Sequence, residues 1–177
     1  VSLVLAFCVT DVLGRTGNLI LNGNASGGMA NWNKGADIPF GTINIPAIPY
    51  LFPEGTDIFY SGPSSHPYGN SAYQNVDLSP YKDAIKTGSV TARFSGLLRG
   101  DPGEGDKIQL KMKIYEEVAP GSFEEIGEFH TTPTNDGAWN THYLIQKLPA
   151  STHHVQVWMD GVPWDTVDAP GDAQDTV

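Results

Sequence analysis

Between residues 107 and 115, apolar and polar side chains alternate without a break. The apolar members are Ile108, Leu110, Met112 and Ile114. The polar positions between them include Lys107, Gln109, Lys111 and Lys113. Because successive side chains of a strand point to opposite faces, a period of two predicts a half-buried strand. We expect the apolar set to be buried and the polar set to be exposed.

Glycine and proline punctuate the rest of the chain, with 20 Gly and 13 Pro among 177 residues. This content argues against long helices and favours short strands joined by turns. Alternation recurs at residues 90–95, 139–145 and 153–159, and a short strand is expected just before the turn at residues 22–23. Strands that recur with turn-rich connections predict an all-β chain, an antiparallel β-sandwich or barrel. We expect Trp32 and Trp139 to lie in its core.

One short helix is expected near residues 80–86. Ser79 suits the N-cap, Pro80 suits the first helical position, and Gly88 suits the end of the helix.

The first nine residues form the most apolar run of the chain. The run is too short to cross a bilayer, which takes about 20 residues. It fits either a signal-peptide remnant, with Ala6 and Cys8 at the small cleavage positions, or a buried N-terminal strand. We divide the chain into residues 1–14 and a single β-sandwich domain at 15–177. If residues 1–9 are retained, we expect them to pair as a strand.

Charge and cysteine content exclude several classes of function. The chain has 10 Lys and Arg against 20 Asp and Glu, a formal net charge of -10. Phosphate backbones and anionic lipids repel such a chain, so we expect neither a nucleic-acid partner nor membrane insertion. Cys8 is the one cysteine, which rules out an intrachain disulfide and a cysteine-based zinc site.

Four local strings, in order, resemble the galactose-binding-domain-like jelly rolls, the superfamily of many carbohydrate-binding modules and lectins. The strings are residues 18–25 followed by Trp32, then 71–79, 88–96 and 148–157. The resemblance extends over about residues 18–160. It implies a jelly-roll sandwich that binds carbohydrate.

Two departures from the family pattern concern calcium and the last strand. Many members carry a Glu that helps hold a structural calcium where this chain has Ser26. Many also close the sandwich with a final strand that is absent or only begun before Val177. A missing strand would leave an edge open, and a homo-oligomer could form through that open edge strand.

The best ligand candidates lie in a loop rich in aromatic, amide and hydroxyl groups. Sugar recognition needs an aromatic face for the C–H surface of the ring and hydrogen-bonding groups for its hydroxyls. The expected carbohydrate-binding residues are Tyr60, His66, Tyr68 and Asn70, with Trp164 as a second candidate. Trp158 ranks below them, because it could pack against the opposite sheet. The alternative is a loop structured by Pro and Gly that binds nothing.

Metal and modification sites are weaker candidates. Asp101, Glu104 and Asp106 lie on a Gly-rich loop that could wrap oxygen ligands around calcium, although an acidic turn needs no metal. His130 and His142 could meet across two strands, but no third zinc ligand is evident, and His153 and His154 should point to opposite faces of their strand. Asn24 begins the one N-glycosylation sequon.

Nothing in the chain resembles a catalytic motif, so we expect no enzyme. Glu116-Glu117 and Glu124-Glu125 flank the turn at Pro120-Gly121, and we interpret them as a solvated hairpin end. The leading hypothesis is a secreted, lectin-like module whose partner is a glycan or glycoprotein. The main alternative is an extracellular structural subunit of a matrix, shell or filament without a sugar site. An accessory domain of a longer hydrolase is a third possibility.

Overall fold

The structure is a computed structural model that describes residues 6–11, 14–15, 17–34, 41–45, 56–60, 71–99, 107–134 and 137–162. Within these ranges one sheet has, in order, the strands β10 (Asn140–Lys147), β7 (Thr91–Leu98), β1 (Ala6–Asp11) and β2 (Gly14–Arg15). A second sheet has, in order, the strands β3 (Asn33–Lys34), β6 (Ser71–Asp77), β11 (Thr152–Val162), β8 (Lys107–Ala119) and β9 (Ser122–His130). A separate hairpin joins β4 (Gly41–Ile45) to β5 (Thr56–Tyr60).

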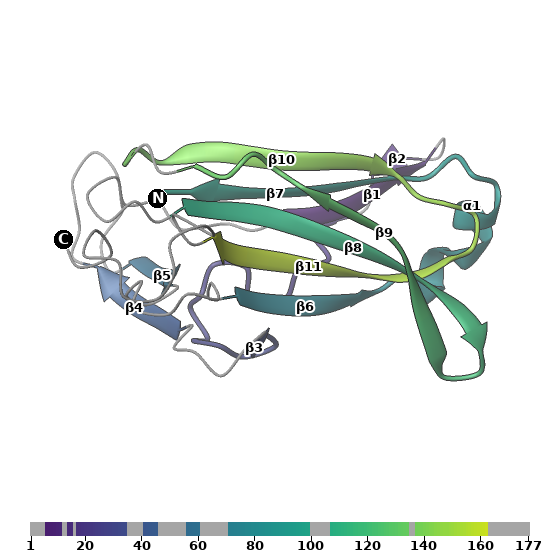
Figure 1. The fold of residues 1–177 in the computed structure, drawn as a ribbon, viewed down its shortest axis with the longest axis horizontal. Helices are drawn as coiled ribbons and strands as arrows, with labels where there is room; N and C mark the ends of the chain where they lie inside the picture. Colours follow the sequence, from purple (N-terminus) through teal and green to yellow (C-terminus); the bar gives the residue numbers. More distant parts are fainter. Residues whose placement is uncertain are drawn as a thin grey trace, which may run out of the picture.

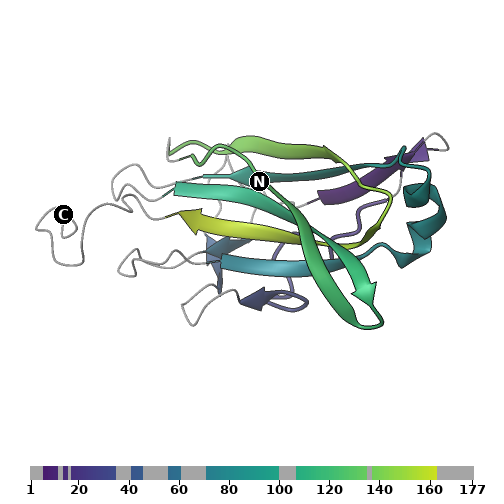
Figure 2. The same ribbon diagram turned by 45° about the vertical axis from the view of Figure 1, so that its right-hand side comes forward.

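The two larger sheets stack as the layers of a sandwich, with α1 at one end and the β4–β5 hairpin at the other (Figures 1 and 2). All strand pairs in the described ranges are antiparallel. β11 lies in the middle of the five-stranded sheet, between β6 and β8. The predicted antiparallel β-sandwich with one short helix is confirmed.

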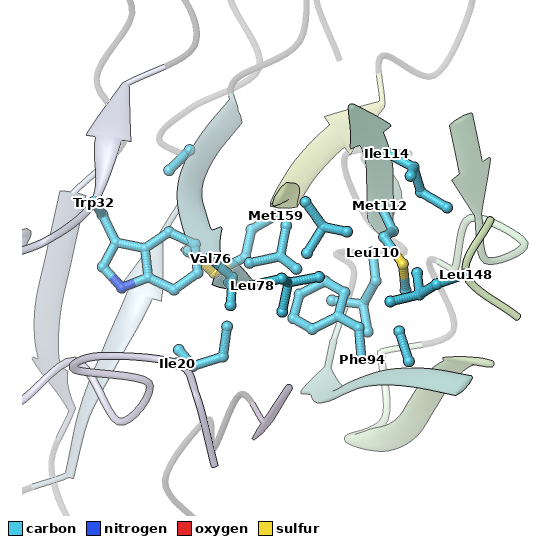
Figure 3. Packing of buried hydrophobic residues seen from close by; sticks show 14 of the residues in the cluster. Ile20, Trp32, Val76, Leu78, Phe94, Leu110, Met112, Ile114, Leu148 and Met159 are labelled. Atoms are coloured by element: carbon cyan, nitrogen blue, oxygen red, sulfur yellow. The ribbon is translucent and has the colours of Figure 1, made fainter. Parts of the chain in front are cut away.

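Apolar side chains from the facing sheets fill the space between the layers (Figure 3). Phe94 of β7 is fully buried beside Leu78, and Leu110 of β8 approaches from the other layer. Trp32 is a core residue as expected, and its ring meets Phe59 edge-on at 5.2 Å. Trp139 was expected in the core as well, and this is wrong: it is half-buried and lies outside the buried cluster.

The alternating stretch at 107–115 forms β8, and its inner face follows the prediction at Leu110, Met112 and Ile114. Ile108, at the start of the strand, is only half-buried. The expected exposure of the polar set is wrong, since the three lysines are half-buried and Gln109 is 8% exposed. The reason is that β8 is an interior strand, so side chains of β11 and β9 cover its outer face.

The expected helix is present as a 3-10 turn, Ser79–Tyr81, followed by α1, Lys82–Lys86. Gly88 ends it with φ +67°, and its N–H donates to the Ile85 carbonyl at 2.8 Å. The prediction of Ser79 as N-cap is wrong. Asp77 precedes the turn and accepts hydrogen bonds from the Ser79 N–H at 2.8 Å and the Ser79 hydroxyl at 2.9 Å. These bonds lower the pKa of the Asp77 carboxyl.

The short strand expected before Asn22-Gly23 is absent, and residues 17–31 run as an irregular segment and turns. The side chain of Gln74, 4% exposed, supplies the hydrogen bonds that a neighbouring strand would otherwise give. Its Oε1 accepts from the Leu21 N–H at 2.8 Å, and its Nε2 donates to the Leu21 carbonyl at 2.9 Å. Asn22 has φ +52°, which is consistent with the expected turn.

The described part of the N-terminal apolar run is the strand β1. It pairs with β7 from Ala6 opposite Ser95 to Thr10 opposite Thr91. Residues 6–9 therefore pair as a strand, which was the second of the two interpretations of this run. Residues 1–5 lie outside the described residues. The division at residues 14 and 15 stays a prediction. In the described part of the chain, no helix has the length and apolar character to cross a membrane.

Candidate functional site

Two aromatic rings stack on the outer face of the five-stranded sheet. Trp158 of β11 lies opposite Tyr73 of β6, with ring centroids 4.5 Å apart and planes 26° apart. Val157 and Met159 are fully buried, so the intervening Trp158 points away from the core. The alternative that Trp158 packs against the opposite sheet is therefore wrong. Both stacked residues are half-buried.

Polar groups of β8 and β11 surround this stack. Lys111 lies opposite Trp158, and its Nζ is 5.5 Å from the Trp158 ring centroid. The same Nζ lies 2.9 Å from Asp160 Oδ2, which also accepts a hydrogen bond from Gln109 Nε2 at 2.9 Å. Three side chains from two strands are thus held in one network beside the aromatic pair.

Two atoms of this cluster are buried without a hydrogen-bond partner in the described part of the chain. They are Gln109 Oε1, an acceptor, and Trp158 Nε1, a donor. Such atoms are uncommon because leaving a buried polar atom unsatisfied costs about 1–3 kcal/mol. The cluster therefore holds one free acceptor and one free donor, the two kinds of group to which a hydroxyl can hydrogen-bond.

A charged cluster adjoins the stack on the side of β9. Lys113 Nζ lies 2.9 Å from Glu125 Oε2 and 2.9 Å from Glu128 Oε2. The bonds to Glu128 and Glu125 raise the pKa of Lys113, and the bond from Lys113 lowers the pKa of Glu128. Lys113 Nζ also lies 5.9 Å from the Trp158 ring centroid, so both lysines found near this ring in the described ranges are ion-paired.

The β8–β9 hairpin extends away from the body of the sandwich (Figure 2). A second aromatic group is formed by side chains of this hairpin and of β11. Tyr115 stacks on His154 with the ring planes 1° apart. The ring centroid of Phe123 lies 4.8 Å from that of His153 and 4.9 Å from that of His154. Burial, followed by the nearby His153, lowers the pKa of His154, and burial raises the pKa of Tyr115. The two histidines were expected on opposite faces, and this is wrong because β11 has a bulge here.

Most of the residues expected to bind sugar lie outside the described residues. The structure describes only the backbone of Tyr60, where it ends β5. The other members outside the description are His66, Tyr68, Asn70 and Trp164, and the same holds for the calcium candidates Asp101, Glu104 and Asp106.

The described residues that flank these segments meet at one end of the sheet. Ser71 begins β6 opposite Asp160, and Lys107 begins β8 opposite Val162, the last residue of β11. Chain segments 61–70, 101–106 and 163–177 are therefore attached at the end of the sheet where Asp160 and the Trp158 stack lie.

The remaining candidates gain little from the structure. Asn24 is exposed in a turn, where its Oδ1 accepts a hydrogen bond from the Ser26 hydroxyl at 2.9 Å. No three His, Cys, Asp or Glu side chains in the described ranges converge as a metal site. The expectation that His130 and His142 meet across two strands is wrong, because β9 and β10 belong to different sheets. The two glutamate doublets lie at the hairpin beside the Pro120-Gly121 turn, as expected.

Sequence reasoning missed the group formed by Tyr73, Gln109, Lys111 and Asp160. Alternation does place Gln109 and Lys111 on the face of β8 opposite the core, and Asp160 on the matching face of β11. What alternation cannot supply is the register of β6, β11 and β8, which brings these positions together.

No protein-family model matches the chain, and no curated protein matches it. Among solved structures, it is similar to "Family 16 Carbohydrate Binding Module-2", with 18% identity, a TM-score of 0.51, and coverage of 82% of this chain and 92% of that chain. It is also similar to the CBM22-2 xylan-binding domain from Paenibacillus barcinonensis Xyn10C, with 16% identity, a TM-score of 0.50, and coverage of 84% and 86%. The fold is that of carbohydrate-binding-module jelly rolls, which confirms the predicted fold resemblance.

Proposed function

We propose that the chain is a non-catalytic carbohydrate-binding module that binds glycan on the outer face of the five-stranded sheet. The observation that carries the proposal is the outward stack of Trp158 on Tyr73 beside the unsatisfied Gln109 Oε1 and Trp158 Nε1. The two modules similar in fold are named for carbohydrate binding, and one of them for xylan. Secretion stays a prediction.

The chemistry of this face suits a sugar. An aromatic ring offers an apolar surface to the C–H groups of a pyranose, while its hydroxyls need both donors and acceptors. Gln109, Trp158 and Asp160 supply an amide, an indole N–H and a carboxylate within one cluster. A sugar hydroxyl that reaches Gln109 Oε1 or Trp158 Nε1 would satisfy a buried atom, which favours binding by removing part of its desolvation cost.

The charge of the site favours a neutral glycan. Lys111 is paired with Asp160, and Lys113 with Glu125 and Glu128, so an acidic sugar would have to displace a carboxylate to reach either cation. The chain as a whole has a net charge of -10, which opposes acidic ligands further.

The predicted loop residues extend this site in our proposal. Segments 61–70 and 163–177 are attached at the Asp160 end of the sheet, and we propose that Tyr68 and Trp164 add aromatic rings and Asn70 adds an amide to the site there. Calcium at Asp101, Glu104 and Asp106 and glycosylation at Asn24 stay predictions.

The test is a comparison of Trp158→Ala with Tyr143→Ala, an aromatic residue exposed on the other sheet. The wild-type chain is first screened against neutral and acidic polysaccharides by affinity electrophoresis, and the dissociation constant for the best ligand is measured by calorimetry. We expect Trp158→Ala to weaken binding at least about tenfold and Tyr143→Ala to leave it unchanged. A folded Trp158→Ala with full affinity would place the site elsewhere, and a wild type that binds no glycan would overturn the function.

Assembly is a second candidate function, because β10 carries an apolar pair on an open edge. Within the described ranges β10 pairs only with β7, and Tyr143 and Ile145 are each 57% exposed on its outer face. An edge strand of this kind can add a strand from another chain. A structural subunit or a homo-oligomer would use this edge, while the glycan site lies on the other sheet.

A further inference from the structure

Two neighbouring histidines of β11 turn their rings toward one another beside the β8–β9 hairpin. In an unbroken strand they would point to opposite faces. The pairing of β11 with β8 shifts from Thr152 opposite Glu116 to His154 opposite Tyr115, so His153 is the extra residue of a β-bulge. As a result, Nδ1 of His153 and Nδ1 of His154 lie 3.3 Å apart.

We propose that His153 and His154 bind a divalent transition-metal ion through their two Nδ1 atoms. A zinc–imidazole bond is about 2.0–2.1 Å long, so two nitrogens on one tetrahedral ion lie about 3.3–3.4 Å apart. The observed separation of 3.3 Å equals this ligand-to-ligand distance. Imidazole is a preferred ligand of zinc, copper and nickel, whereas calcium and magnesium prefer oxygen.

A carboxylate next to the far nitrogen of one ring supports the proposal. Glu117 Oε2 lies 4.0 Å from His153 Nε2, and Glu117 Oε1 is fixed by a hydrogen bond from the Gly121 N–H at 3.0 Å. A carboxylate on that side favours the proton on Nε2 and leaves the lone pair of Nδ1 directed at the neighbouring ring. Metal-binding histidines typically donate the second ring N–H to a carboxylate; at 4.0 Å Glu117 is beyond hydrogen-bond distance and acts on His153 through its charge.

The rings are already held in place. Tyr115 lies parallel to His154 with centroids 4.8 Å apart, and Phe123 contacts both histidine rings. Side chains ordered before binding lose less conformational entropy when the ion arrives. Asp77 of β6 lies opposite His154 in the sheet, so the carboxylates of Asp77 and Glu117 supply negative charge near the ion.

The site would have two protein ligands. No group of three His, Cys, Asp or Glu side chains in the described ranges could hold a metal, so water would occupy the remaining coordination positions. Two ligands give a weaker site than the three or four of catalytic and structural zinc centres. The proposal is independent of glycan binding, because Trp158 takes no part in it.

The test titrates the full chain with Zn²⁺ by calorimetry and with Cu²⁺ by electron paramagnetic resonance, including a pulsed measurement of the remote imidazole nitrogens. We expect one ion per chain, and coupling of Cu²⁺ to two imidazoles. His153→Ala should weaken binding at least about tenfold, and Glu117→Gln should weaken it by a smaller factor. His130→Ala, on β9, is the matched control and should bind as the wild type does.

Either of two results would overturn the proposal. One is that the wild-type chain binds neither ion. The other is that His153→Ala folds and binds the ion as tightly as the wild type does. His154→Ala removes a stacking partner of Tyr115, so it serves as a second variant only if its circular dichroism matches that of the wild type.

Discussion

At the scale of single residues, one buried amide organises a long stretch of irregular chain. Gln74 is 4% exposed, and its side chain bonds to the Leu21 N–H, the Leu21 carbonyl and the Asn31 carbonyl. Backbone groups that a strand would satisfy are satisfied here by a residue 53 positions from Leu21 and 43 positions from Asn31 in the sequence. This one side chain therefore fixes the segment around Trp32 against β6.

Replacing Gln74 by Ala should strip these backbone groups of their partner. Each backbone group left buried without a partner costs about 1–3 kcal/mol, so we expect the free energy of unfolding to fall by at least that amount. The loss is larger if no water replaces the side chain as a partner of the remaining backbone groups. Urea denaturation followed by fluorescence measures the change. Gln146→Ala, on β10, is the control, since its side chain makes one long hydrogen bond of 3.4 Å. Equal stability of the two variants would contradict this account.

At the scale of elements, the β8–β9 hairpin is held by charge as well as by its backbone. Lys113 of β8 bonds to Glu125 and Glu128 of β9, and these bonds raise the pKa of the lysine and lower the pKa of Glu128. A carboxyl with a lowered pKa stabilises the fold above its unfolded pKa of about 4.3, and this contribution is lost as the pH falls through the folded value. For a lysine with a raised pKa, the contribution is present below about 10.4 and is lost as the pH rises through the folded value.

Replacing Lys113 by Met should therefore destabilise the chain most between about pH 5 and pH 10. The glutamates are more than one-third exposed, so solvent screening limits the loss to about 1 kcal/mol or less. Urea denaturation at neutral pH and near pH 3 should show the difference from wild type shrinking at the acidic pH. Lys147→Met, an exposed lysine of β10, should show no such trend. A deficit that stays constant down to pH 3 would argue against the ion pairs.

At the scale of the whole molecule, the sandwich uses its two outer faces differently. The five-stranded sheet presents a polar face with stacked rings, whereas the edge strand β10 of the other sheet presents Tyr143 and Ile145. An antiparallel pair of β10 strands centred on Leu144 would set Tyr143 of one copy opposite Ile145 of the other, an aromatic–aliphatic pair of the stabilising kind. β10 contains no Asp or Glu, so no carboxylates would face one another across this junction.

We expect a concentration-dependent dimer that forms through this edge. Sedimentation equilibrium should show the wild type dimerising, and Ile145→Lys should shift it to monomer because a charge would enter the apolar pair. Val118→Lys, at an exposed apolar position on the hairpin, controls for added charge and should dimerise normally. A wild type that remains monomeric up to about millimolar concentration would remove β10 as an assembly edge.

The sequence by itself determined the features that depend on neighbours in the chain. Alternation identified the inner face of β8 at Leu110, Met112 and Ile114, because side-chain direction in a strand repeats every two residues. Gly88 ended the helix, and the Pro120-Gly121 turn closed the hairpin, because backbone conformation at such residues is a local property.

Tertiary structure alone decided the features that depend on register and on distant partners. Trp158 meets Tyr73, and Gln109 is buried beside Asp160, because β11 pairs with β6 and β8 at one particular alignment. The bulge at His153 turned two histidines to the same side, and no alternation pattern in the chain marks it. Where the pairing is regular, local sequence specifies which face a side chain occupies within its own strand, whereas bulges and cross-strand neighbours are set by the alignment that best buries the shared core.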